Sequence, residues 1–351
     1  MRIAWFAPPD PLDDTASLLV ELGSTHQVEA FDERRAHDFV WQHARQRFEV
    51  CVYELSDTPA ARFLWPYLLQ YPGIARLRAP LSRLTSPGGR DARIPLLASR
   101  LVVVADAALA GTLQERHPAA RIRHAPLGVD APTAASAAAE VSASARRAPE
   151  DPPVVGVVDA SALEVVARAG ARAREAGSRF EVRADSIERL VAGGCDLIVS
   201  FRWPPGPEPP LAALSAMAAA RPAIVHEAGV TAHWPALDPQ TWQPRGVIGS
   251  AEPIVVSIDP VDEEHSLMLA IRRLARDADL RTRLGAAAHA WWRAHATPAH
   301  AAAAWTPLLE EAATLAPPER PNDWPAHLTP DGTESARAIL AEFGVSVDFL
   351  E

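Results

Sequence analysis

The chain contains no lysine: all 34 of its basic residues are arginine, against 44 acidic residues. This absence excludes lysine chemistry, whether Schiff-base catalysis or phosphate binding by an ammonium group. The net charge of −10 argues against nucleic-acid binding, because little positive charge is available to neutralise a phosphate backbone. With 33 prolines and abundant alanine, the arginine bias is typical of a GC-rich genome rather than of a mechanism.

Cysteine is also scarce, since only Cys51 and Cys195 are present. Each lies in or beside a strand-like apolar run, so we expect buried, reduced thiols and a reducing compartment. The apolar run at the N-terminus is too short for a signal peptide, and no segment approaches the length of a membrane span. We therefore expect a soluble, cytoplasmic protein without a transmembrane segment.

The first 128 residues alternate between apolar strands and helices, which predicts parallel strands joined by right-handed crossovers. The expected strands are residues 2–6, 26–31, 48–53, 73–77 and 101–104, closed by 121–124. The expected helices are residues 15–22, 34–47, 60–71 and 107–115. This pattern is typical of a Rossmann-like domain over residues 1–128.

A second alternating run follows residues 129–153, an Ala-, Pro- and Ser-rich stretch without hydrophobic periodicity that we interpret as a linker. The expected strands of residues 154–316 are 154–158, 180–183, 197–201, 223–226 and 254–258. The expected helices are 162–176, 186–192, 211–220, 264–275 and 280–295. Residues 317–351 form a proline-rich tail with a terminal helix at 333–343, which we expect to cross back to the first domain. The fold class is α/β, with two tandem Rossmann-like domains facing across a cleft.

Residues 196–214 (DLIVSFRWPPGPEPPLAAL) combine a strand, an arginine, a proline-rich turn with one carboxylate, and a helix start. This order places Arg202 and Glu208 at the carboxyl end of a strand and the amino end of a helix. In doubly wound folds, phosphate-bearing ligands bind at such a corner. The alternative is a structural salt bridge between Arg202 and Glu208, or a helix-terminal acid stabilised by the macrodipole.

Five tracts resemble a bacterial branch of the family 4 glycosyltransferases, which have the GT-B fold. Residues 202–208 (RWPPGPE) resemble its RWP–x–x–GE–x–S signature, and residues 223–242 resemble the block that follows. Residues 255–292, with VSIDPVDEEHSL, DADLRTRLGAAA and AWW, continue the match. In the first half, residues 53–73 (YELSDTPAARFLWPYLLQYPG) and the hinge at 124–129 (HAPLGV) resemble the family's equivalents.

The resemblance implies a UDP- or GDP-linked sugar donor bound mainly by the second domain and a glycan, lipid or small-molecule acceptor on the first. It also implies transfer with retention and no metal or other cofactor, because a helix terminus and basic side chains offset the leaving diphosphate. No Asp-x-Asp motif occurs in a suitable place. The implied donor residues include Glu208, for the ribose hydroxyls, and Arg202, for a phosphate.

The donor side departs from the family in several places. Where the family has Thr-Ser-Gly after the glutamate, this chain has Pro209, Pro210 and Leu211, which removes backbone donors that an anion would use. Ser215 replaces a second carboxylate. The first strand–loop of the second domain offers Asp159 instead of arginine and lysine, and this domain looks shortened between residues 181 and 196.

The acceptor side departs as well. The loop after the first strand, residues 8–14 (PPDPLDD), contains Pro8, Asp13 and Asp14 but no glycine. The family's Gly-Asn pair corresponds to Ser56 and Asp57, and part of a histidine-bearing tract corresponds to Arg78 and its neighbours. These residues are the candidate acceptor-side loop, and no catalytic residue can be named among them.

Other polar groups have open interpretations. His226, Glu227 and His233 follow a strand and are either cleft residues or ordinary loop residues. Residues 262–264 (DEE) are the acidic first turn of a helix. The helix at 34–47 either contacts a membrane surface or a partner peripherally, or combines an exposed basic face with a core stripe. No GxGxxG, P-loop, HExxH or Ser-His-Asp arrangement is present.

The leading hypothesis is a glycosyltransferase acting on a nucleotide sugar and a sugar acceptor. The alternative is a catalytically inactive homologue that acts as a partner or scaffold of an active glycosyltransferase. A nucleotide-sugar epimerase is a third, weaker hypothesis. The departures on both sides of the cleft keep the alternative open.

Overall fold

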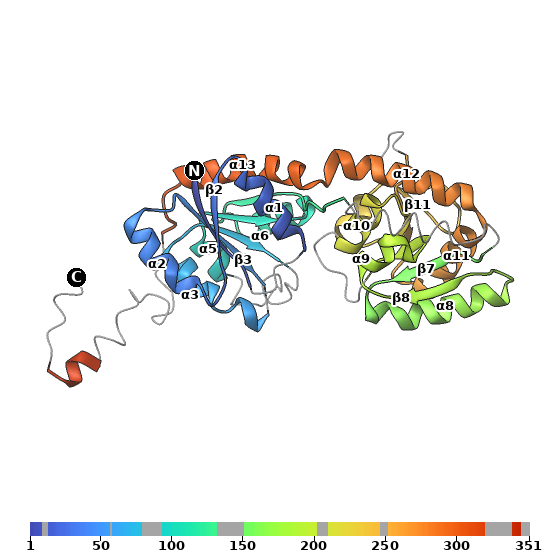
Figure 1. The fold of residues 1–351 in the computed structure, drawn as a ribbon, viewed down its shortest axis with the longest axis horizontal. Coiled ribbons are helices and arrows are strands. Elements are labelled where there is room, and N and C mark those ends of the chain that lie inside the picture. Colours follow the sequence, from blue (N-terminus) through green and yellow to red (C-terminus); the bar gives the residue numbers. More distant parts are fainter. Residues whose placement is uncertain are drawn as a thin grey trace.

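The computed structural model describes residues 1–8, 13–56, 58–78, 93–131, 151–201, 210–245, 252–319 and 339–344. They form two α/β domains that lie side by side, with one long helical path along both (Figure 1). The predicted fold class is confirmed. Each domain contains a sheet of parallel strands with helices on both faces.

The first domain is built on a six-stranded parallel sheet in the order β2-β1-β3-β4-β5-β6. Its four inner strands are almost entirely buried, because a parallel sheet covered on both faces needs nearly continuous apolar runs such as VCVYEL. The bounds of the strands are β1 Arg2–Phe6, β2 Gln27–Phe31, β3 Val50–Leu55, β4 Ile74–Leu77, β5 Leu101–Val104 and β6 Ile122–His124.

Helices cover both faces of this sheet. One face packs against α2 (Ala36–Arg45), α3 (Leu64–Gln70), α5 (Arg93–Ala98) and α6 (Ala107–Arg116), around an aromatic group centred on Phe6. A short 3₁₀ turn, η1 (Pro59–Ala61), precedes α3. The other face packs against α1 (Asp13–Gly23) and against a helix from the far end of the chain.

The second domain is built on a seven-stranded sheet in the order β12-β11-β13-β10-β9-β7-β8. Among the described strands of this sheet, β11 and β12 pair antiparallel and the others pair parallel. The bounds are β7 Val154–Val157, β8 Glu181–Ala184, β9 Leu197–Val199, β10 Ala223–His226, β11 Ala236–Leu237, β12 Pro244–Arg245 and β13 Val255–Ile258. The strand pairing confirms that this half is Rossmann-like.

The helices of the second domain form two layers. The short turn η3 (Ala160–Ala162), α8 (Leu163–Glu175) and α11 (Glu263–Arg276) cover one face. The opposite face packs against α9 (Ile187–Arg189), η4 (Leu190–Gly194), α10 (Leu211–Ala218) and α12 (Ala278–His295). The 3₁₀ turn η5 (Gly229–His233) follows β10. Both cysteines are buried and free, as expected.

The helix that crosses back to the first domain is α13 (Pro298–Thr314), which continues the path of α12 (Figure 1). Its Trp305 lies on Trp5 of β1, with ring centroids 5.1 Å apart. The predicted hinge lies against the α12–α13 junction, where Val129 N–H donates to the Ala296 carbonyl at 2.9 Å. The sequence placed the crossing in the terminal helix at 333–343 instead. Of that segment only 339–343 lies in the described ranges, with 339–342 helical.

At one edge of the second sheet, α9 and η4 connect β8 to β9, and β8 ends the strand order. The expected shortening of this domain relative to the family stays a prediction. The sequence prediction missed α5, α13, β11 and β12, which are short or alanine-rich. No helix within the described ranges is long and apolar enough to cross a membrane.

The contact between α10 and α12 depends on Gly285. A Cβ at this position would lie 2.1 Å from the carbonyl oxygen of Ala220, which itself has a φ of 54°. Gly285→Ala should therefore lower the free energy of unfolding by about 1–3 kcal/mol, because the helices must separate. Urea denaturation measures this change.

Gly111 of α6 is the matched control, since no described atom lies within 4 Å of a Cβ built there. Gly111→Ala should raise the free energy of unfolding by about 0.5–1 kcal/mol through helix propensity. Equal effects of the two substitutions would contradict the packing argument.

Candidate functional site

Four charged side chains converge at the carboxyl end of the first sheet. Glu54 of β3 and Arg76 of β4 lie opposite each other in the strand register. Arg78 follows β4, where its N–H donates to the Leu55 carbonyl at 2.7 Å. Asp14 and Thr15 belong to the first turn of α1, which starts at this edge. We call Asp14, Glu54, Arg76 and Arg78 the ionic cluster.

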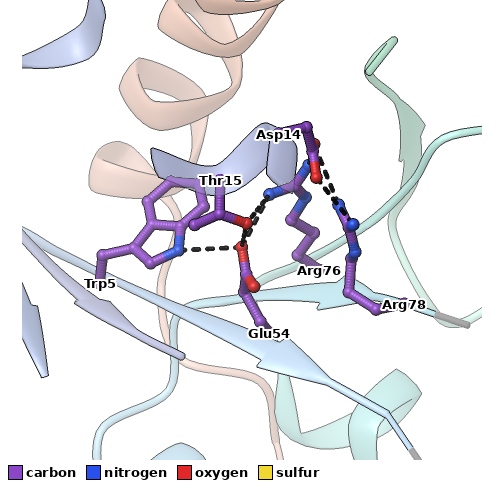
Figure 2. Close-up of polar contacts among 6 residues, drawn as sticks. All are labelled: Trp5, Asp14, Thr15, Glu54, Arg76 and Arg78. Carbon is purple, nitrogen blue, oxygen red and sulfur yellow. Dashed lines mark hydrogen bonds and ion pairs between the residues drawn. The ribbon is translucent and has the colours of Figure 1, made fainter. Parts of the chain in front are cut away.

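Figure 2 shows how these groups bond one another. Arg78 donates to both carboxylate oxygens of Asp14, at 2.8 and 3.1 Å. Arg76 donates to Asp14 and, at 2.7 Å, to Glu54 Oε1. The same Glu54 oxygen accepts from Thr15 Oγ1 at 2.7 Å and from Trp5 Nε1 at 3.1 Å.

The ionic cluster is buried but electrically balanced. Its side chains are between 1% and 4% exposed, and two guanidinium groups face two carboxylates. Burial acts to raise the pKa of Asp14, but Arg76 and Arg78 outweigh it and hold that pKa below its ordinary value of 3.8. Breaking one pair would leave an uncompensated charge inside the protein.

The returning helix α13 completes this arrangement. The Arg76 guanidinium carbon lies 5.8 Å from the ring centroid of Trp5 and 5.5 Å from that of Trp305. Both indoles shield the cation and add cation–π attraction. The ionic cluster thus connects α1, the sheet and α13.

The sequence nominated Asp14 and Arg78 and missed Glu54, Arg76, Thr15 and Trp5. The structure brings all six together. A signal was present: an acid and an arginine occupy otherwise apolar strands, a pattern that predicts a buried ion pair when the strands are neighbours. Because these charged groups pair with one another, their contacts join α1 to the carboxyl end of the first sheet.

A second constellation lies at the carboxyl end of the second sheet. His226 ends β10 and is 4% exposed, and its Nε2 lies 2.7 Å from Oε1 of Glu263. Its ring stacks on Phe201, with centroids 4.1 Å apart. Phe201 follows β9 and directly precedes the stretch that contains Arg202. This pair therefore fixes the start of the predicted donor corner.

Burial favours the neutral imidazole of His226. Burial lowers its pKa below the ordinary 6.5, although the Glu263 carboxylate acts in the opposite direction. Nε2–H then donates to Glu263, in the first turn of α11. The acidic turn predicted at 262–264 is confirmed, and Glu264 pairs with Arg168 and Arg172 of α8.

A cavity of about 370 Å³ adjoins this end of β10. Glu227 and Ser257 are among the residues that line it, with Thr231 and Trp234. Glu227 is ion-paired with Arg245 of β12, which also contacts Asp238 at 2.8 Å. The cavity therefore offers charged groups and a serine hydroxyl at the strand ends.

The other nominated residues have simpler positions. Asp159 accepts from Ser161 N–H at 2.8 Å, so it caps η3. Pro210 is the N-cap of α10 and Leu211 its first residue. Pro8 follows β1, Asp13 starts α1 and His233 ends η5. Arg202, Glu208, Pro209 and Asp57 lie outside the described residues.

The carboxyl ends of the two sheets point toward the same interface. The turn η5, which follows β10, contacts α6, which begins just after β5. Ala105, at the end of β5, is part of the apolar cluster of the second domain. Within the described ranges, no group of three or more His, Cys, Asp or Glu side chains is arranged to hold a metal ion.

Comparison with solved structures defines the fold. HepE of Anabaena in complex with UDP-glucose superposes with a TM-score of 0.59 at 12% identity, covering 88% of this chain and 99% of that one. Sucrose-phosphate synthase of Thermosynechococcus elongatus superposes with a TM-score of 0.60 at 15% identity, covering 89% of this chain and 98% of that one. An E. coli trehalose-6-phosphate protein bound with UDP-2-fluoro glucose superposes with a TM-score of 0.54 at 10% identity, covering 90% of this chain and 100% of that one. The chain has the GT-B fold of glycosyltransferases. No family model and no curated protein matches the sequence.

The ionic cluster should dominate the stability of the first domain. Arg76→Met leaves Asp14 and Glu54 short of a cation, so the free energy of unfolding should fall by about 3–5 kcal/mol. Arg189→Met is the control, because that side chain is 78% exposed and should change stability by less than about 0.5 kcal/mol. Chemical denaturation distinguishes the two, and a loss below about 1 kcal/mol for Arg76→Met would contradict the assignment.

Asp14 should make stability pH-dependent in acid. Its folded-state pKa lies below the ordinary 3.8, so its contribution is full above that value and is lost as the pH falls through the lower folded-state pKa. Asp14→Asn should be less stable at neutral pH and lose less stability between about pH 5 and pH 2. Thermal melts across this range measure the difference, with exposed Glu33→Gln expected to follow the wild type.

Proposed function

We propose that the protein is a glycosyltransferase of the family 4 type, which transfers a sugar from a UDP- or GDP-linked donor to a glycan, lipid or small-molecule acceptor. The donor occupies the carboxyl edge of the second sheet, and the acceptor lies on the first domain. The reaction retains the anomeric configuration and uses no metal. The observation that carries the proposal is the pair formed by buried His226 and half-buried Glu263 at the carboxyl end of the second sheet of a GT-B fold.

Three features support donor binding by the second domain. The amide N–H groups of Leu211 and Ala212 precede the first hydrogen bond of α10, which Ala213 N–H makes to Pro210. They supply the positive end of a helix to a diphosphate. His226, held by Glu263 and Phe201, is a positioning residue for the stretch that contains Arg202 and Glu208. HepE, solved with UDP-glucose, has the same fold.

A second candidate function is an inactive homologue that acts as a partner of an active glycosyltransferase. The ionic cluster favours it, because Asp14 and Arg78 bond each other at the edge where the acceptor was expected. Asp159 likewise places a carboxylate, rather than a cation, at the first strand–loop of the donor domain. The two candidates differ in turnover and share the ability to bind a nucleotide.

Thermal shift with UDP, GDP, UDP-glucose and GDP-mannose tests the donor site. A donor at one hundred times its Kd should stabilise the protein by about 2.7 kcal/mol. Arg202→Ala and Glu208→Ala should abolish this shift, and His226→Ala should reduce it. Exposed Glu188→Ala and His37→Ala are the matched controls and should keep it.

Release of free nucleotide, measured with a coupled assay and candidate acceptors, separates the two functions. Binding with turnover supports the transferase. Binding without turnover against any acceptor supports the inactive homologue. Absence of a shift with every nucleotide would overturn donor binding and with it the transferase.

A further inference from the structure

The edge strand β8 is open to solvent along its whole length. All four of its residues, Glu181 to Ala184, are exposed, whereas β7 beside it is completely buried. In the strand order of the described chain, β8 ends the sheet. An open edge presents unpaired N–H and C=O groups, which are a template for another strand.

The hydrogen bonds to β7 define which backbone groups face outward. Glu181 N–H donates to the Pro153 carbonyl, and Asp185 N–H donates to the Val157 carbonyl. The backbone groups of the odd-numbered residues of β8 therefore face β7. The backbone groups of Val182 and Ala184 therefore point away from the sheet, since these groups alternate along a strand. The outward face of β8 is ready to accept an antiparallel partner.

The side chains of this edge are complementary to themselves. If two copies of β8 pair about a two-fold axis through Val182, Glu181 of each copy lies opposite Arg183 of the other. These are the positions without direct backbone bonds, where opposed side chains approach most closely. The same pairing places Val182, which is 36% exposed, against its own copy on the opposite face.

The local structure is compatible with this register. Phe180 packs on Gly170 of α8, so Val182 and Ala184 lie on the α8 side of the sheet. Glu181 and Arg183 lie on the other side, where Arg183 donates to the Gly194 carbonyl at 2.8 Å. A two-fold axis perpendicular to the sheet keeps both α8 helices on one side and joins two seven-stranded sheets into one.

We propose that β8 is a homodimer interface, in which two copies of this chain pair antiparallel through residues 180–184 about Val182. The occupant is a second copy rather than an unrelated strand, because the charges on the edge match their own two-fold image. In a single copy, only the charges of Glu181 and Arg183 would protect this edge from pairing with other strands. The interface is independent of nucleotide binding and of the function proposed above.

Site-specific disulfide formation tests the register. In the proposed pairing the two Val182 Cα atoms lie about 5.5 Å apart, within the span of a disulfide. Val182→Cys should therefore form an intermolecular disulfide under mild oxidation, seen as a doubled mass on non-reducing gels. Ala184→Cys is the matched control: it is exposed on the same strand, but its two copies would be offset by about 14 Å and should not cross-link.

Charge reversal provides a second, independent measurement on the full chain. Sedimentation velocity should show a species of twice the chain mass of 37.7 kDa. Glu181→Arg should raise the dimer Kd by about tenfold, and Glu181→Arg/Arg183→Glu should restore it. A monomer at every concentration, equal cross-linking at positions 182 and 184, or a double variant that behaves like the single one would overturn the proposal.

Discussion

The ionic cluster of Asp14, Glu54, Arg76 and Arg78 is the interaction on which the first domain depends. It joins the start of α1 to β3 and β4, and the indoles of Trp5 and Trp305 connect it to α13. Because α13 continues the path of α12, the same contact ties the second domain to the first (Figure 1). Buried charges of this kind specify one arrangement, since any other would leave a charge without its partner.

The two sheet edges of the GT-B fold have different chemistry. At the first, carboxylates and guanidinium groups bond one another and are shielded from solvent. At the second, His226 is held by Glu263 and Phe201, and a cavity adjoins the strand ends. A site that binds a charged ligand must leave some groups incompletely paired. The ionic cluster pairs its charges internally, whereas the end of the second sheet adjoins a cavity lined by Glu227, Arg245 and Ser257.

The sequence predicted most of the strands because their apolar runs, bounded by Pro, Gly and acidic residues, carry a strong local signal. It placed β10 and β5 at their observed bounds. It missed α13, whose alanine-rich pattern has no clear apolar face and which contains Pro307. It nominated Asp14, Arg78 and His226, which the structure places in the two clusters at the sheet edges. Glu54, Arg76 and Glu263 escaped because their roles depend on which strands and helices become neighbours.

By itself, the sequence determined two alternating α/β halves and the absence of lysine chemistry. These follow from periodicity and composition, which are local properties of the chain. Only the tertiary structure decided that Asp14 and Arg78 pair with each other, that α13 returns to the first domain, and that β8 remains an open edge. These outcomes depend on contacts between residues far apart in the sequence, and no local pattern specifies which of them form.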